Sequence, residues 1–292
     1  QWRNRLELGA TVAVRSEWYQ PLGGDRDRFV SAYGDHELRR IELFDRQGDP
    51  LAVFRRRTTR IGFDHGWHLG PVGNWGDVRL GWSGARRQSL PDFVNNTMLG
   101  VVQPETWTES ALRLSVVTDQ LDHANFPSQG LRFKFDIQTG HFSNRQGRTP
   151  FQRWELEHTQ VATWGAHTVS GHLRVAHSNA ITLGAVDEYA LGGFHQLSGY
   201  RLGQVVGNNI VLGRLAYYHR LPFQPGVARA LFAGATLELG NAWASSQAMA
   251  WNRLHVGSSL FVGADTGVGP VYLGLVHAPK GYTGVYFLLG RP

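Results

Sequence analysis

Residues 131–137 read "LRFKFDI", and this stretch decides the fold class because apolar and charged side chains alternate in it without a break. Successive side chains of a β-strand point to opposite faces. One face of this stretch is wholly apolar, with Leu131, Phe133, Phe135 and Ile137, and the other carries Arg132, Lys134 and Asp136. The period of two residues predicts a strand with one apolar and one polar face.

The same alternation recurs along the chain. Residues 5–15 place Leu6, Leu8, Ala10, Val12 and Val14 on one face, and residues 229–239 place Glu238 opposite a row of Leu and Ala. No helical periodicity, internal linker or repeat is evident, so we expect a single all-β domain over residues 1–292. We predict about fourteen strands, at 5–18, 28–43, 51–69, 76–88, 95–104, 108–121, 130–141, 151–164, 167–178, 208–221, 227–243, 251–267, 269–279 and 282–291.

Strand length and tryptophan placement distinguish between the two architectures that alternating strands allow. A soluble sandwich or barrel buries its apolar face, whereas a membrane barrel turns that face to lipid and its polar face to a lumen. Many predicted strands reach the roughly 9–11 residues that span a bilayer. Tryptophans near strand ends are typical of the aromatic girdles of membrane barrels, and here they are Trp18, Trp67, Trp75, Trp107, Trp154, Trp164, Trp243 and Trp251. We therefore expect a transmembrane antiparallel β-barrel.

The composition excludes several kinds of chemistry. The chain has 292 residues and no cysteine, so it has no disulfide, zinc–thiolate site or thiol nucleophile. No G-x-S-x-G motif occurs, and His65 and His68, three residues apart on a predicted strand, face opposite ways. We predict no catalytic residue, no metal site and no cofactor.

The net charge of +6 comes almost wholly from arginine, since Lys134 and Lys280 are the only lysines. The arginines are spread over the chain, so we predict no nucleic-acid partner. "RRRTTR" at residues 55–60 is the densest run. It would suit a nucleic-acid or lipopolysaccharide patch, but a solvated strand or strand end is the simpler interpretation.

Residues 191–209, "LGGFHQLSGYRLGQVVGNN", predict a functional loop. The connection is long, from about residue 178 to residue 208, and long loops in compact domains are usually functional or disordered. Its side chains are apolar and aromatic rather than solvating. It leads into "NIVLGRLAYYHRLP", a predicted strand whose polar face carries Arg214, Tyr218 and Arg220.

These stretches resemble a known family. "GGFHQLSGYRLG", "LGRLAYYHRLP", "ATLELGNAW", "GADTGVGPVYLGLV" and "YTGVYFLLG" resemble the C-terminal half of the outer-membrane assembly and translocation barrels that carry periplasmic POTRA domains. The variant L-S-G-Y-R followed by Y-Y-x-R-L resembles the barrel of patatin-like autotransporters of type V-d secretion. The resemblance covers nearly the whole chain. It implies sixteen strands and a long extracellular loop that folds back into the lumen.

The resemblance also implies site residues. The loop tip that docks on the inner wall corresponds to Leu197, Ser198, Gly199, Tyr200 and Arg201, and the wall to Glu238, Tyr218, Arg214 and Arg220. A turn between two strands corresponds to Asp119, Leu121, Asp122, Phe126, Pro127 and Gly130.

Two features depart from the family pattern. The tip usually carries Arg where this chain has Ser198, and the docking strand usually carries Glu where it has Tyr218. We hypothesise that Arg201, or another lumen arginine, pairs with Glu238 and holds the loop inside the barrel. Residue 1 corresponds to the third strand of the family pattern, so either two strands lie upstream or the count of about fourteen is wrong.

The resemblance implies a non-catalytic translocator in the outer membrane of a Gram-negative bacterium. It would export or anchor an N-terminal patatin-like lipase passenger, with POTRA and passenger domains upstream. The implied partners are outer-membrane lipids, the passenger, and periplasmic chaperones or assembly machinery; a homodimer is one compatible assembly. The alternatives are a two-partner secretion transporter, a porin-like channel, and an outer-membrane enzyme that uses lumen or rim residues.

Overall fold

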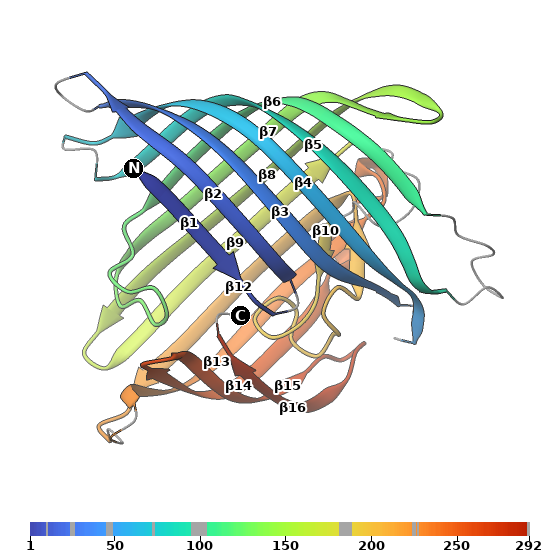
Figure 1. Cartoon of the computed structure of the whole chain (residues 1–292). Helices are drawn as coiled ribbons and strands as arrows, with labels where there is room; N and C mark the ends of the chain where they lie inside the picture. Colours follow the sequence, from blue (N-terminus) through green and yellow to red (C-terminus); the bar gives the residue numbers. More distant parts are fainter. Residues whose placement is uncertain are drawn as a thin grey trace. The chain divides into compact units, whose positions relative to one another are not determined.

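The computed structural model describes residues 1–9, 11–23, 27–44, 49–71, 74–94, 104–180, 189–223, 226 and 228–290, and most of them are in strands (Figure 1). Fourteen strands hydrogen-bond in one sheet in chain order, with β12 following β9, while β10 and β11 pair separately. The strands are β1 (Trp2–Glu7), β2 (Thr11–Leu22), β3 (Arg28–Phe44), β4 (Pro50–Leu69), β5 (Gly76–Val94), β6 (Glu105–Asp119), β7 (Gly130–Asn144), β8 (Gly147–Trp164), β9 (His167–Ser178), β10 (Tyr189–Leu191), β11 (Val205–Gly207), β12 (Asn209–Arg220), β13 (Ala228–Trp243), β14 (His255–Thr266), β15 (Gly269–His277) and β16 (Thr283–Leu289).

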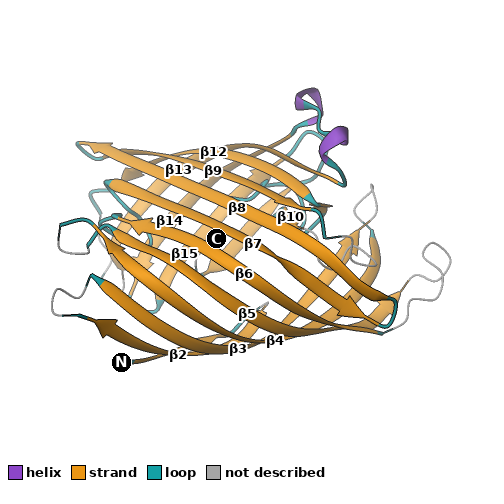
Figure 2. Cartoon of the chain, turned by 90° about the horizontal axis from the view of Figure 1, so that it is seen from above, coloured by secondary structure: helices purple, strands orange, loops and turns teal. Residues whose placement is uncertain are grey.

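Helical structure is confined, within the described ranges, to two short 3-10 turns between β13 and β14, drawn purple in Figure 2. They span Ser246–Ala248 and Trp251–Arg253. None of the described helical segments has the length and apolar character needed to cross a membrane.

The chain divides into two compact units. Unit 1 comprises Gln1–Thr118, Lys134–Glu155 and His177–Glu188, and unit 2 comprises Asp119–Phe133, Leu156–Ala176 and Tyr189–Pro292. Each unit has buried apolar clusters of its own.

The strands of unit 2 have one exposed apolar face and one buried mixed face. On β13, Leu237 and Leu239 are 49% and 43% exposed, whereas Glu238 between them is fully buried. The predicted alternation in this strand is therefore confirmed. The register joins the exposed positions across strands, for example Leu215 to Leu237 and Leu260 to Leu275, so they form a continuous apolar surface.

Unit 1 repeats this arrangement. Phe63 on β4 is paired with Trp82 on β5, which is paired with Leu112 on β6, and all three side chains are exposed. The opposite face is polar and buried: Arg79 binds Glu17 at 2.7 Å and Asp77 at 2.9 Å. Exposed apolar patches of this extent require an apolar environment.

The predicted strand at 5–18 was wrong, because residues 8–10 separate β1 from β2. Leu6 and Val14 still share a face, since antiparallel pairing places them opposite each other. Leu8 lies outside both strands, and Ala10 lies outside the described residues. Glycine at residue 9, with φ +150°, explains the interruption that alternation alone conceals.

Other predicted strands lie partly outside the described residues or differ from the structure at their ends. Residues 95–103 of the predicted strand 95–104 lie outside the described residues, and Pro104 precedes β6. The strand predicted from 251 begins at His255, after a 3-10 turn. Trp107 and Trp243 are only 4% and 6% exposed, so they do not belong to an exposed girdle, and the Trp107 ring lies on the polar side, where its N–H donates to Glu109. Apart from 95–104, the thirteen other predicted strands correspond to the fourteen strands of the sheet, because the prediction 5–18 covers both β1 and β2.

Replacing Leu273 with Arg tests the environment of the exposed face. Leu273 lies in the middle of β15 and is 56% exposed. If lipid surrounds it, the charge costs about 2–4 kcal/mol near the bilayer midplane. We expect a lower unfolding free energy in lipid vesicles, measured by denaturant titration, and little effect of Val268→Arg in the turn between β14 and β15. Equal stability of Leu273→Arg and the native chain would contradict a lipid-facing surface.

Candidate functional site

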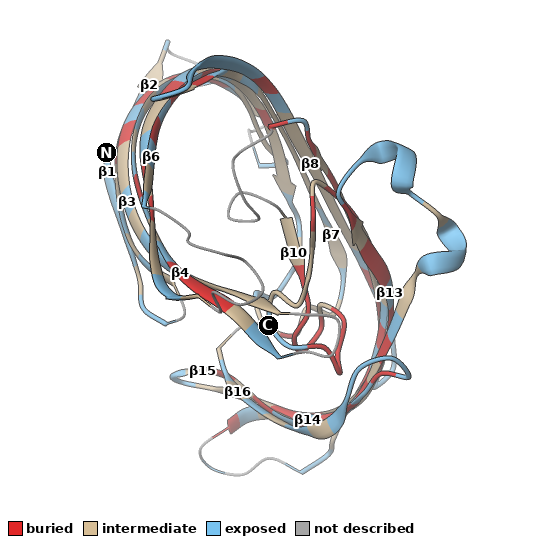
Figure 3. Ribbon diagram, turned by 90° about the vertical axis from the view of Figure 1, so that its right-hand side faces the viewer, coloured by how far each residue is buried: buried red, intermediate tan, exposed pale blue. Residues whose placement is uncertain are grey.

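Residues 189–207, which precede β12, pack against the buried face of unit 2. The two ends of this stretch are held together by the pairing of β10 with β11. Between them, residues 191–200 are buried, with Gln196 alone half-buried, and Figure 3 colours much of this segment red beside β10. The connection predicted as one loop from 178 to 208 thus contains a small antiparallel pair and a packed loop.

Glu238 on β13 holds the tip of this loop. Its Oε2 accepts hydrogen bonds from the backbone N–H groups of Leu197, at 3.0 Å, and Ser198. Its Oε1 accepts the Ser198 hydroxyl at 2.9 Å and the Thr236 hydroxyl at 2.6 Å. A fully buried carboxylate is stable only when its oxygens are satisfied, and here the loop tip provides three of the four donors.

The hypothesis that Arg201 or another lumen arginine pairs with Glu238 was wrong for Arg201; the arginine that lies beside Glu238 is Arg214. The carboxylate is satisfied by backbone groups and by Ser198 and Thr236, and Arg201 is an exposed residue. The absence of Arg from position 198 is therefore compensated by direct backbone donation. A serine is short enough to bring its own N–H and the preceding N–H against the carboxylate.

Arg214 lies beside Glu238 on the neighbouring strand, since the two residues are register partners in β12 and β13. Its guanidinium donates to the backbone carbonyl of His195 in the loop at 3.0 Å. It therefore attaches the loop to the wall at a second point. Burial and the nearby Arg214 charge hold the pKa of His195 well below its ordinary value, so this ring stays neutral.

The backbone of the tip shows how strongly these contacts constrain it. Leu197 has φ +86°, a conformation that a leucine rarely adopts and that costs about 1–3 kcal/mol. Such a conformation persists only when the surroundings enforce it. The two N–H bonds to Glu238 and the complete burial of Leu197 do so.

Gly199 and Gly257 explain the need for glycine at this site. Gly199 has φ +86°, and a Cβ there would lie 2.5 Å from the backbone nitrogen of Ala278. A Cβ on Gly257 in β14 would lie 2.6 Å from the carbonyl oxygen of Ser198. The loop thus approaches the backbone of β14 and the backbone just after β15 so closely that a side chain at Gly199 or Gly257 would clash.

Tyr200 and Gly199 extend the contact to other strands. The Tyr200 hydroxyl lies 3.0 Å from His255 Nδ1 at the start of β14, and its ring is 2% exposed. The carbonyl of Gly199 accepts from the N–H of Tyr282, in the turn between β15 and β16, at 2.8 Å. The tip therefore binds β13, β14 and the β15–β16 connection together.

The turn from Asp119 to Gly130 packs on the same buried face of unit 2. Asp122 accepts the N–H groups of Ser128 at 2.8 Å and Gln129 at 3.2 Å. Although partial burial opposes ionisation, these bonds and the Ser128 hydroxyl lower the pKa of Asp122. Leu121 donates its N–H to Asp119 at 3.4 Å, and Gly130 closes the turn with φ +107°.

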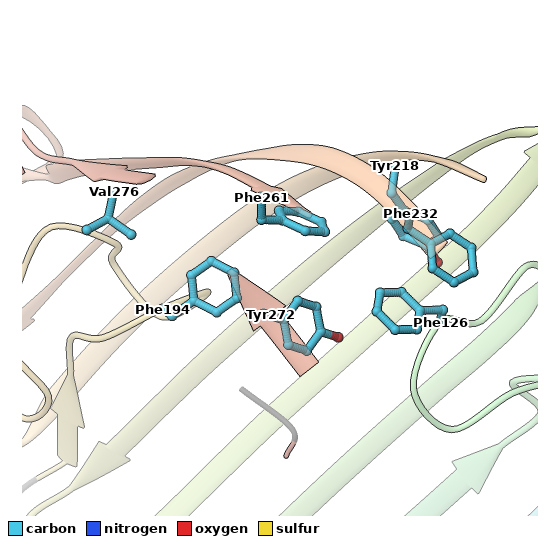
Figure 4. Packing of buried hydrophobic residues seen from close by; sticks show 7 residues of the cluster. All are labelled: Phe126, Phe194, Tyr218, Phe232, Phe261, Tyr272 and Val276. Carbon is cyan, nitrogen blue, oxygen red and sulfur yellow. The ribbon is translucent and has the colours of Figure 1, made fainter. Parts of the chain in front are cut away.

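An aromatic cluster joins this turn to the sheet and to the loop (Figure 4). Phe126 stacks on Phe232 with ring centroids 4.2 Å apart and meets Tyr272 at 5.3 Å. Phe194 of the loop contacts the same Tyr272 at 5.5 Å. The Tyr218 hydroxyl donates to the carbonyl of Pro127.

The predicted wall residues thus serve different segments. Glu238 and Arg214 hold the loop, whereas Tyr218 binds the turn and only shares an aromatic cluster with Phe194. Arg220 is exposed at the end of β12 and contacts the chain near Ala166 through its backbone N–H. The sequence interpretation was wrong to group Tyr218 and Arg220 with the tip, because they lie four and six positions beyond Arg214 on β12, which is about 13 and 20 Å along the strand.

Three residues that contact the loop or hold its anchor were not predicted as site residues from the sequence. Thr236 lies two positions before Glu238, so alternation alone puts it on the same face. Phe194 was recognised only as an apolar loop residue. His255, the partner of Tyr200, had no detectable signal. Within the described part of the chain, no group of three His, Asp or Glu side chains is arranged to hold a metal ion.

Replacing Glu238 with Ala is expected to free the loop tip. It leaves two N–H groups and two hydroxyl groups without their acceptor, each bond to a charged group being worth about 1.5–3 kcal/mol. Because the chain has no native cysteine, a single spin label at Gln196→Cys reports on the loop alone. We expect a mobile label in Glu238→Ala and an immobile one in Glu105→Ala, which removes a carboxylate from β6. An immobile label in both variants would contradict the anchor.

Replacing Phe126 with Ala is expected to loosen the turn. The ring is 8% exposed and stacked on Phe232, and such a truncation costs about 3–5 kcal/mol. Thermal unfolding in detergent should begin at a lower temperature, whereas Phe223→Ala, at a residue 68% exposed, should change little. Equal thermal stability of the two variants would mean that the cluster contributes nothing.

Comparison with known proteins identifies the family. The model of the Omp85 superfamily domain matches residues 11–274. No curated protein matches the sequence as a relative. BamA from Haemophilus ducreyi, in a structure lacking POTRA domains 1–3, is similar with a TM-score of 0.71 at 12% identity, covering 96% of this chain and 61% of that chain.

Two structures of CdiB are also similar. CdiB from Acinetobacter baumannii has a TM-score of 0.59 at 12% identity, with 96% of this chain and 50% of that chain covered. CdiB from Escherichia coli has a TM-score of 0.58 at 15% identity, with 96% and 51% covered. The chain thus spans between about half and three fifths of the length of these proteins. Because the family model covers most of the chain and the antiparallel all-β fold agrees with it, the chain belongs to the Omp85 superfamily of Gram-negative outer-membrane β-barrel proteins.

Proposed function

We propose that the chain is the barrel of a type V-d autotransporter, which exports or anchors an N-terminal patatin-like passenger and has no catalytic activity of its own. The observation that carries the translocator role is the loop tip held by the buried carboxylate of Glu238. We infer that the loop is released from this seat during export, which would give it two discrete arrangements. The passenger subtype is supported by the order of motifs in the sequence.

The polar face provides a path suited to an unfolded chain. In unit 1 it carries arginines paired with carboxylates, such as Arg87 and Arg153 with Glu109 at 3.1 and 2.6 Å. Paired charges of both signs offer hydrogen-bonding groups without a strong field of one sign. We infer that export is driven by folding of the passenger outside the cell.

The alternatives are a two-partner secretion transporter, whose substrate is a separate protein, and a porin-like channel. The residues immediately upstream of Gln1 in the natural protein distinguish them from the autotransporter. A domain with G-x-S-x-G supports an attached lipase passenger. A chain whose upstream part carries POTRA domains alone supports two-partner secretion.

Export is tested with the natural full-length protein produced in a Gram-negative host. We expect protease added to intact cells to reach the passenger in the native protein, and at least tenfold less passenger at the surface of a Glu238→Ala variant with equal barrel folding. Barrel folding is checked by heat-dependent mobility on electrophoresis. Undiminished surface passenger with a released loop would show that the seated loop is not needed for export.

A further inference from the structure

The exposed face of β4 changes from apolar to basic along its length. At alternate positions it carries Trp67, Phe63 and Ile61, which are 39%, 50% and 60% exposed. The next residues on this face are Thr59 and the exposed Arg57. This arginine belongs to the "RRRTTR" run, whose members therefore face alternately outward and inward.

Arg86 on β5 lies next to Arg57 on the same face. Thr59 is the register partner of Arg86, and Arg57 is the partner of Gln88, so the two arginines are diagonal neighbours across one strand pair. Diagonal positions lie about 7–8 Å apart at their backbones. Two flexible guanidinium groups at that spacing reach a single phosphate group together.

Other arginines of this face are neutralised, but these two are not. Arg40 binds Glu42 at 2.8 Å and Arg55 binds Asp92 at 2.7 Å. Among the residues that the structure describes, neither the Arg57 nor the Arg86 side chain has a hydrogen bond or an ion pair, and both are exposed. The face thus carries two uncompensated positive charges at this place.

The position along the strand corresponds to the border of a lipid layer. Trp67 and Arg57 are ten residues apart on β4, which is about 33 Å along a strand. For a strand tilted by about 45°, this gives a height of roughly 25 Å, the height of the apolar band of a membrane barrel. Trp67 therefore marks one border, and Arg57 with Arg86 marks the other.

We propose that Arg57 and Arg86 form a binding site for the phosphate group of an anionic membrane lipid. The guanidinium groups bind the lipid phosphate, which matches their planar donors. Ile61 and Trp82, further along the same face, contact the acyl chains. A nucleic acid is a poorer match, because the basic pair directly adjoins an exposed apolar surface.

The test is lipid retention by the folded chain in detergent, measured by native mass spectrometry with phosphatidylglycerol, lipid A and phosphatidylcholine as probes. The native chain is expected to retain the two anionic lipids and not phosphatidylcholine. Arg57→Gln combined with Arg86→Gln should lower the affinity about thirtyfold, since each basic residue near a lipid surface contributes about 1 kcal/mol. Arg57→Lys with Arg86→Lys should retain most of the binding because the charges remain.

The matched control is Arg145→Gln with Arg148→Gln, which removes two exposed arginines at the β7–β8 turn. This variant should retain anionic lipid as the native chain does. Equal losses in the two double variants, equal retention of phosphatidylcholine, or displacement of the lipid by glycerol phosphate or an oligonucleotide at equal concentration would overturn the proposal.

Discussion

The structure of unit 2 depends on one buried carboxyl group, that of Glu238. Glu238 is completely inaccessible to solvent, and it has no water to replace a missing donor. Four donors satisfy it, and three of them belong to a loop some forty residues earlier in the chain. The buried carboxyl group of Glu238 therefore needs the loop for its hydrogen bonds, and the same hydrogen bonds hold the loop in place. This reciprocity explains why a leucine accepts a left-handed backbone conformation at position 197.

The turn from Asp119 to Gly130 uses a different kind of contact on the same face. Its attachment is largely aromatic, through Phe126, and it touches the sheet where Phe232 and Tyr272 are buried. Phe194 of the loop joins the same cluster. Apolar contacts are not directional, so they hold the turn and the loop without fixing them as a carboxylate does. Glu238 therefore fixes the exact position of the loop tip, whereas the aromatic residues contribute non-directional packing.

The sequence interpretation identified Glu238 and the tip correctly as positions but paired them wrongly. Alternation places Glu238 on the polar face, and the motif order points to Leu197–Tyr200. Which atom meets the carboxylate depends on the path of the loop backbone, and a pattern of residue types contains no such information. The same limit explains Tyr218, whose hydroxyl binds a carbonyl 91 residues away. It also explains His255, whose role follows from the position of Tyr200.

Alternation by itself determined the all-β fold, the strand faces and the apolar exterior, because a period of two residues is a local property of strands. Composition determined the lack of thiol chemistry. Alternation could not show that residues 5–18 divide into β1 and β2, since cross-strand partners share a face just as alternate residues do. Only the tertiary structure decided the partners of Glu238, the contacts of the turn and the diagonal placement of Arg57 and Arg86 across β4 and β5, because each arises from contacts between segments that are distant in sequence.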